Sequence, residues 1–167
     1  MNAIFGYTKA LMQIMKMEAE YIIMTFDSGG KTFRSEADAT YKAQRDGMPD
    51  DLASQMDAIF EVTDLLGIPR VAVPGFEADD IIGTLAVKHR DDMERVLIVS
   101  SDKDLFQFIG RHVYVYDAMK DRLYDEEEAV KKFEVHPGQI VDYLALIGDT
   151  ADNIPGVKGI GPKTAVT

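Results

Sequence analysis

"RVLIVSSDKDLFQFI", residues 95–109, joins an apolar, β-branched run to a polar turn and then to a second apolar segment. The pattern predicts a strand that runs into a helix, with Ser100 or Ser101 as the helix N-cap. Asp102 and Asp104 stand in the turn, at the carboxyl end of the strand. Ligands of parallel α/β sheets bind at this end. The stretch therefore predicts an α/β fold and places two acids where a ligand would bind.

Further strand and helix patterns alternate on both sides of this stretch. "YIIMTFD" (21–27) is typical of a buried strand, "RVAVPG" (70–75) of a short strand, and "HVYVYDA" (112–118) alternates like an outer strand. Helices are expected over 50–66, with Gly67 at the end, over 76–89 and over 136–148. An N-terminal helix would share one apolar face among Ile4, Phe5, Thr8, Leu11, Met12 and Met15. The alternation favours a mostly parallel sheet flanked by helices.

Composition limits the compartment and the classes of site. The 167 residues carry a formal net charge of −11 and no cysteine, which excludes disulfides and zinc–thiolate sites. No apolar run is long enough to span a membrane, so we expect a cytoplasmic protein with no membrane partner. Basic residues gather in two places, between Lys31 and Arg45 and at Lys158 and Lys163. His89, His112 and His136 receive no role.

Acidic residues recur where the predicted strands and the last long helix end. Asp27 ends the first strand, and the other members are Glu77, Asp79, Asp80, Asp102, Asp104, Asp149 and Asp152. Each cluster alone could simply cap a helix. If the clusters converge, each close pair costs about 4 kcal/mol at an effective dielectric near 20. Divalent cations would relieve this repulsion, and carboxylate ligands suit Mg²⁺ or Mn²⁺. Two such ions can activate water and stabilise the leaving oxygen of a phosphodiester.

The segment "GVKGIGPKTA" (156–165) predicts a phosphate-binding turn. Gly159 and Gly161 allow a tight backbone turn, and Pro162 suits the first position of a helix. Backbone N–H groups beside Lys163 would bind an anionic oxygen. This is the pattern of a helix–hairpin–helix element, which holds a nucleic-acid backbone without reading bases.

Five segments together resemble the 5′-nuclease domain of bacterial DNA polymerase I, within the flap-endonuclease family. They are "FDSGGKTFR", "YKAQRDGMPDDL", "GFEADDIIGTLA", "SSDKDLFQFI" and "LALIGDTADNIPGVKGIGPKTA". The resemblance implies a PIN/5′-nuclease-like fold and places the eight acids named above on the metal site. It implies two divalent cations, Mg²⁺ or Mn²⁺, and a monovalent cation at the hairpin. The expected activity is 5′-3′ exonuclease or 5′-flap endonuclease cleavage of DNA in replication and repair.

The same resemblance gives roles to the basic segment, residues 28–49. In the family this region forms a helical arch over the active site, through which a single-stranded 5′ end passes. Arg34 and Lys42 are expected to stabilise the charge of the scissile phosphate. The expected nucleic-acid contacts are Lys31, Tyr41, Arg45, Lys158, Gly159, Ile160, Gly161, Lys163 and Thr164. Lys31 and Arg45 are equally compatible with a solvated basic loop.

The resemblance also predicts that the chain consists of two parts and that it departs from the family pattern. Residues 1–147 would form the nuclease core and residues 148–167 part of the helix–hairpin–helix element. The family's opening strand and its metal-binding aspartate have no counterpart before the first helix. We therefore expect marginal stability and impaired activity of this chain in isolation, with a fused polymerase domain as one arrangement of the full-length protein.

Three functions stay open at this point. The first is a metal-dependent nuclease that removes nucleotides or flaps from 5′ ends of DNA. The second is a module of the same family that binds branched DNA without cutting it. The third is a receiver-like α/β domain with Asp27 as its phosphorylated nucleophile, which leaves the hairpin and the basic segment without a purpose.

Overall fold

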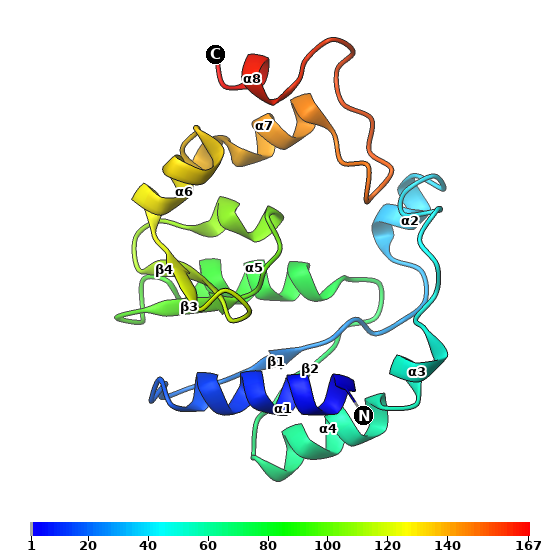
Figure 1. Cartoon of the computed structure of the whole chain (residues 1–167), viewed down its shortest axis with the longest axis vertical. Coiled ribbons are helices and arrows are strands. Elements are labelled where there is room, and N and C mark those ends of the chain that lie inside the picture. Colours follow the sequence, from blue (N-terminus) through cyan, green and yellow to red (C-terminus); the bar gives the residue numbers. More distant parts are fainter. Residues whose placement is uncertain (1) are drawn as a thin grey trace. The chain divides into compact units, whose positions relative to one another are not determined.

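The computed structural model describes residues 2–167, which form two compact units (Figure 1). The first unit comprises the residues up to 30 together with 46–81. The second comprises residues 31–45 together with 82–167. The basic segment is therefore divided, and its central part belongs with the C-terminal half of the chain.

The first unit contains a short parallel sheet and its helices. Strand β1 (Met24–Thr25) pairs with β2 (Arg70–Val71), with Met24 opposite Arg70. The helices are α1 (Asn2–Met15), α3 (Asp50–Ala53), α4 (Met56–Leu65) and the start of α5 (Ala78–His89). Both predicted strands exist, but each is much shorter than its apolar run.

Helix α1 packs on α4 through a narrower face than its sequence predicts. Leu11 is buried, whereas the Phe5 side chain is 72% exposed and Met12 is 57% exposed. The Tyr7 hydroxyl forms a 2.6 Å hydrogen bond with the buried Thr63 hydroxyl on α4. The Tyr7–Thr63 hydrogen bond therefore joins the two helices, and Phe5 and Met12 of the predicted apolar face are largely exposed.

The helix predicted over residues 50–66 is interrupted. Its first turn forms α3, and a new helix, α4, begins at Met56. Ile59 is buried as expected, and Gly67 takes a left-handed φ of 70° just after the helix end. Glycine reaches this conformation without strain, so the predicted end of the helix is confirmed.

The second unit is built on a three-stranded sheet with the order β3 (Val96–Val99), β4 (Val113–Asp117), β5 (Arg122–Tyr124). Strands β3 and β4 are parallel, and β4 and β5 are antiparallel. The remaining elements are α2 (Phe33–Ala37), η1 (Asp104–Phe108), α6 (Glu126–Phe133), η2 (Pro137–Gln139), α7 (Ile140–Ile147) and α8 (Pro162–Ala165).

Strand β4 lies in the middle of this sheet, so the prediction of an outer strand is wrong. Val113, Val115 and Tyr116 are all buried, and Asp117 at the strand end is 3% exposed. The alternation expected of an outer strand breaks down at Tyr116. Strand β5 covers the second edge of β4, because the turn at residues 118–121 returns the chain antiparallel to it.

The core of the second unit lies between the sheet and the short helices that follow it. Phe106 of η1 and Ile140 of α7 are fully buried, and Phe106 makes edge-to-face contacts with Tyr124 and Phe133. This packing fixes η1, and with it the turn that precedes η1, against the sheet.

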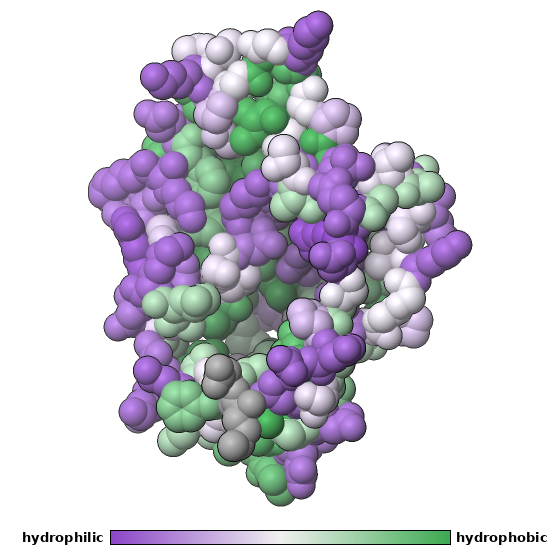
Figure 2. Space-filling model, turned by 45° about the vertical axis from the view of Figure 1, so that its right-hand side comes forward, coloured by the Kyte–Doolittle hydropathy of each residue, from purple (hydrophilic) through white to green (hydrophobic). Residues whose placement is uncertain are grey.

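The molecular face drawn in Figure 2 is largely hydrophilic, with apolar patches between the charged groups. Among residues 2–167, no helix combines the length and the apolar character needed to cross a membrane. The predicted α/β class, with parallel strand pairs and flanking helices, is confirmed.

Candidate metal centre and nucleic-acid interface

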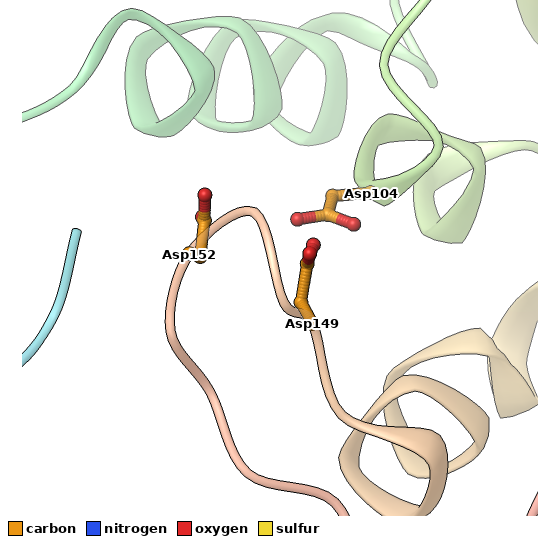
Figure 3. A group of neighbouring side chains, drawn as sticks. All are labelled: Asp104, Asp149 and Asp152. Carbon is orange, nitrogen blue, oxygen red and sulfur yellow. The ribbon is translucent and has the colours of Figure 1, made fainter. Parts of the chain in front are cut away.

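Three of the predicted acids meet in the second unit. One carboxylate oxygen from each of Asp104, Asp149 and Asp152 lies within 4.8 Å of the other two (Figure 3). Asp104 begins η1, and the other two acids stand on the loop after α7. Segments that are distant in sequence therefore contribute to one cluster, which we call the acidic triad.

A tight loop presents Asp149 and Asp152. Helix α7 ends at Ile147, and residues 149 and 154 exchange two backbone hydrogen bonds of 2.8 Å each. The N–H of Val157 donates to the Leu146 carbonyl at 2.8 Å, which returns the chain to the end of the helix. Backbone pairing thus fixes the loop that carries the two carboxylates.

Asp104 is the member of the triad with an unpaired carboxylate oxygen. Its Oδ1 atom is buried and has no hydrogen-bond partner among residues 2–167. Burial is the main cause that raises the pKa of Asp104. Repulsion from Asp102, Asp149 and Asp152 adds to it, and the nearby Lys103 opposes it. A buried acceptor without a partner costs about 1–3 kcal/mol, so a cation beside this atom would stabilise the site.

Asp149 has such a partner. The Lys103 ammonium lies 2.9 Å from Asp149 Oδ2, and the Ala151 N–H donates to Oδ1 at 2.8 Å. Burial would raise the pKa of Asp149, but these hydrogen bonds outweigh it and hold the pKa below its usual value. In return, Asp149 raises the pKa of Lys103 against the opposing effect of burial.

Asp152 is held by the basic segment. Arg45 donates to Asp152 Oδ1, the Tyr41 hydroxyl donates to Oδ2 at 3.3 Å, and Lys42 Nζ lies 3.7 Å from Oδ2. Asp152 is only 7% exposed. Three residues with predicted roles at DNA therefore contact a predicted metal ligand.

The donor set of the triad fits a hard divalent cation. It offers carboxylate oxygens alone, which Mg²⁺, Mn²⁺ and Ca²⁺ prefer over the nitrogen and sulfur ligands of softer metals. A cation beside Asp104 would also satisfy its orphaned oxygen. The chemistry of the residues present is therefore consistent with metal binding.

Asp102 lies beside the triad without joining it. Its Oδ1 accepts the Asp104 N–H at 2.9 Å, and the Asp102 N–H donates to Ser100 Oγ at 3.0 Å. These bonds shape the turn before η1. The predicted serine cap is wrong, because η1 begins after Lys103 and has no side-chain cap there.

The other four predicted acids belong to the first unit, where hydrogen bonds to backbone N–H groups of the same unit hold two of them. Asp27 Oδ1 accepts the Ala78 N–H at 2.7 Å, and Asp80 Oδ2 accepts the Glu77 N–H at 2.9 Å. Asp79 and Asp80 stand in the first turn of α5 as expected. Their capping role is the alternative that the sequence left open, and their convergence with the triad stays a prediction.

The remaining residues of the basic segment surround helix α2. Thr32 and Ser35 form a capping box at its start. The Arg34 guanidinium lies 4.5 Å from the centre of the Phe33 ring, and Lys31 is exposed. The roles predicted for Lys31, Arg34, Tyr41, Lys42 and Arg45 at a DNA phosphate stay predictions.

The hairpin has the predicted backbone. Gly159 takes a left-handed φ of 86°, and α8 begins at Pro162. The N–H groups of Thr164 and Ala165 donate to the Gly161 carbonyl at 3.0 Å. Gly161 itself is extended, so only Gly159 needs the freedom of glycine. Phosphate binding by Lys158, Gly159, Ile160, Gly161, Lys163 and Thr164 stays a prediction.

Sequence reasoning missed three residues of this region. Lys103 pairs with Asp149, the Gln44 side chain donates to the Thr150 carbonyl, and the Asn153 side chain donates to the Thr40 carbonyl at 2.8 Å. The position of Lys103 between two predicted ligands, in "SDKD", was a sequence signal that could have indicated its role. The contacts of Gln44 and Asn153 join positions more than 100 residues apart and leave no local signal.

Comparison with known proteins identifies relatives over the whole chain. Residues 1–134 match the family model for the 5′-3′ exonuclease N-terminal resolvase-like domain, and residues 135–167 match that for the 5′-3′ exonuclease C-terminal SAM fold. The chain is 45% identical to a 5′-3′ exonuclease of Aquifex aeolicus over 99% of its own length and 57% of the relative. It is 40% identical to the thermostable DNA polymerase I of Thermus thermophilus over 98% of its length and 20% of the relative.

The chain thus spans little more than half of the exonuclease and a fifth of the polymerase. Its fold is similar to that of T5 5′-exonuclease solved with bound divalent metal ions (zinc). That match has a TM-score of 0.81 at 24% identity and covers 98% of this chain and 65% of the T5 chain. The catalytic core of Rad2 in complex with DNA matches 98% of this chain and 50% of its own, at a TM-score of 0.59 and 21% identity. With its whole length matched by the two family models, the chain belongs to the 5′-3′ exonuclease family.

Proposed function

We propose that this chain forms part of a metal-dependent 5′-3′ exonuclease and 5′-flap endonuclease that hydrolyses phosphodiester bonds of DNA. The observation that carries the proposal is the acidic triad with the buried, unpartnered oxygen of Asp104. Membership of the family supports the reaction class.

The metal ligands proposed are the triad together with Asp102 and the four acids of the first unit, Asp27, Glu77, Asp79 and Asp80. They would hold two Mg²⁺ or Mn²⁺ ions. Such ions supply an activated water and stabilise the leaving oxygen. Arg34 and Lys42 would stabilise the charge of the scissile phosphate.

The proposed substrate is DNA with a 5′ end or a 5′ flap. The basic segment would contact the single strand as an arch, and the hairpin around Gly159 would hold the duplex backbone, with a monovalent cation beside it. The solved Rad2 core in complex with DNA and a T5 flap endonuclease with DNA and metal ions support this proposal. A fused polymerase domain is part of it, because two relatives are thermostable DNA polymerase I proteins. A cytoplasmic location completes the proposal.

Metal binding to the chain tests the centre. In calorimetric titration with Mn²⁺ we expect Asp104→Asn to weaken binding at least about tenfold, because a charged ligand is lost. Asp92→Asn is the matched control, since Asp92 is exposed after α5, and it should bind like the wild type. Equal Mn²⁺ affinity of the wild type and Asp104→Asn would reject the proposed centre.

A labelled 5′-flap DNA tests the reaction. We expect the flap to be released only when Mg²⁺ or Mn²⁺ is present, and slowly, because the activity of this chain in isolation is expected to be impaired. Binding of the flap without release at every metal concentration would instead identify the chain as a DNA-binding module of the same family.

A further inference from the structure

The basic segment and the loop of the acidic triad are joined by a dense set of contacts. We call residues 40–45 the basic turn and residues 149–153 the acidic loop. Two neutral side chains connect them: the Gln44 amide donates to the Thr150 carbonyl, and the Asn153 amide donates to the Thr40 carbonyl at 2.8 Å. A backbone hydrogen bond of 3.0 Å runs from the Lys42 N–H to the Asp152 carbonyl.

The charged contacts of the basic turn converge on one carboxylate. Both oxygens of Asp152 are engaged, Oδ1 by the Arg45 guanidinium and Oδ2 by the Tyr41 hydroxyl and the Lys42 ammonium. The Arg45 Nε–H also donates to the Ala151 carbonyl at 3.1 Å. The basic turn is therefore bound to the acidic loop, and its positive side chains neutralise the Asp152 carboxylate of that loop.

Asp152 thus has two competing uses. As a member of the triad it offers an oxygen to a cation, and as the partner of the basic turn it already holds two positive side chains. Like charges that share a carboxylate repel one another, so a divalent cation and the two basic side chains disfavour each other's presence. Because Asp152 is nearly buried, solvent screens this competition only weakly.

We propose that the basic turn is a latch on Asp152, closed when the triad holds no metal and opened when a divalent cation binds there. Gln44 and Asn153 are positioning residues that hold the latch closed without contacting the carboxylate. Opening transfers Lys42 and Arg45 from Asp152 to the phosphate of an incoming strand. The inference rests on the proposed function, because it requires a metal at the triad.

The coupling is reciprocal. If metal binding opens the latch, a variant with a weakened latch binds metal more tightly by the factor that the latch contributed. A purely structural contact makes the opposite prediction, since loss of support for the acidic loop would misplace Asp149 and Asp152 and weaken metal binding. The direction of the change therefore separates the two roles.

The first experiment measures Mn²⁺ affinity by calorimetry for the double variant Gln44→Ala/Asn153→Ala. We expect its dissociation constant to fall about fivefold or more relative to the wild type. Gln139→Ala is the control, because the Gln139 side chain accepts a hydrogen bond from the His136 N–H within its own turn, and its affinity should be unchanged. An unchanged or weaker affinity of the double variant overturns the latch.

The second experiment follows the latch directly by hydrogen exchange of the Lys42 amide, which is bonded to Asp152 when the latch is closed. We expect saturating Mn²⁺ to accelerate this exchange about tenfold in the wild type and to leave Asp104→Asn unchanged. Binding of Mn²⁺ without accelerated exchange overturns the latch and leaves the proposed metal centre standing. Absence of Mn²⁺ binding to the wild type overturns both.

Discussion

Gly148 and Gly156 touch each other through their backbones where the acidic loop leaves α7 and returns to it. A Cβ atom on Gly148 would lie 2.3 Å from the Gly156 amide nitrogen, and one on Gly156 would lie 2.4 Å from the Ile147 carbonyl carbon. Gly148 also has a φ of 75° and a ψ of 177°, a region that is essentially restricted to glycine. The two glycines thus allow the crossing that brings Asp149 and Asp152 to Asp104.

Replacement of Gly156 by alanine should therefore push the two backbone segments apart where they cross. We expect Gly156→Ala to lower the free energy of unfolding by about 2–3 kcal/mol, because backbone atoms cannot yield as a flexible side chain can. Chemical denaturation measures the change. Gly138→Ala is the control, since a Cβ at Gly138 meets no atom within 4 Å. Equal stability of Gly156→Ala and Gly138→Ala would contradict the crossing.

The Asp104 carboxylate should lower the stability of the metal-free protein and raise the stability of the metal-bound protein. In EDTA we expect the free energy of unfolding of Asp104→Asn to be about 1 kcal/mol higher than that of the wild type, because the substitution removes a partly buried charge that Asp102, Asp149 and Asp152 repel. In excess Mn²⁺ the order should reverse, since bound metal stabilises only the folded wild type at this position. Thermal unfolding under both conditions measures the two differences. A variant that is less stable in EDTA would show that the Asp104 charge is already balanced.

The fold was predictable wherever local pattern decides structure. The strand at residues 96–99, the end of α4 at Gly67 and the start of α8 at Pro162 all follow from residue type and spacing. The position of β4 did not follow, because its edge is covered by β5, a three-residue strand too short to show a period. Helix α6 was missed since its first turn reads as an acidic run, although Asp125 accepts the Glu128 N–H as an N-cap.

The candidate site was predictable as a list of residue types but not as a set of pairs. Acids after strands and helices indicated Asp104, Asp149 and Asp152, and the structure brings these three together. The pairing of Arg45 with Asp152 joins two residues 107 positions apart, and each had been given a separate partner, phosphate or metal. Sequence patterns indicate which side chains are available but not which of them neutralise one another.

Two glycines in helices should respond to alanine with opposite signs. A Cβ on Gly83 in α5 would lie 2.3 Å from the Phe108 ring, whereas one on Gly6 in α1 would meet no atom within 4 Å. We expect Gly83→Ala to destabilise the fold by about 1–3 kcal/mol through overpacking. Gly6→Ala should stabilise it by about 0.5–1 kcal/mol through helix propensity. Denaturant unfolding of both variants measures the pair, and a stabilised Gly83→Ala would contradict the contact with Phe108.

Asp117 should contribute to stability in a pH-dependent way. Its buried carboxylate accepts hydrogen bonds from the Lys120 ammonium at 2.9 Å and from the Met119 and Lys120 N–H groups. The hydrogen bond from the Lys120 side chain is the main cause that lowers the pKa of Asp117. The backbone donors act in the same direction, and burial acts against them. The contribution is therefore complete above the unfolded-state pKa of about 3.9 and is lost as the pH falls through the lower folded-state pKa.

Comparison of Asp117→Asn with the wild type across pH measures this contribution. We expect the variant to be less stable at pH 7 and the difference to shrink below about pH 4, as the wild-type carboxylate becomes protonated. Asp92→Asn, at an exposed position, should show a small difference at every pH. A stability difference for Asp117→Asn that stays constant down to pH 2 would show that the charge of Asp117 is irrelevant.

Lys163 at the hairpin should contribute to DNA binding through charge alone. Each lysine that neutralises a phosphate releases condensed counterions, so the logarithm of the binding constant falls linearly with the logarithm of the salt concentration. We expect Lys163→Gln to reduce the magnitude of this slope by about 1 for duplex DNA of any sequence. Lys131→Gln is the control, because Lys131 is paired with Glu127 and Glu128 on α6. Fluorescence anisotropy between low and moderate salt measures the slopes, and an identical slope for both variants would remove Lys163 from the interface.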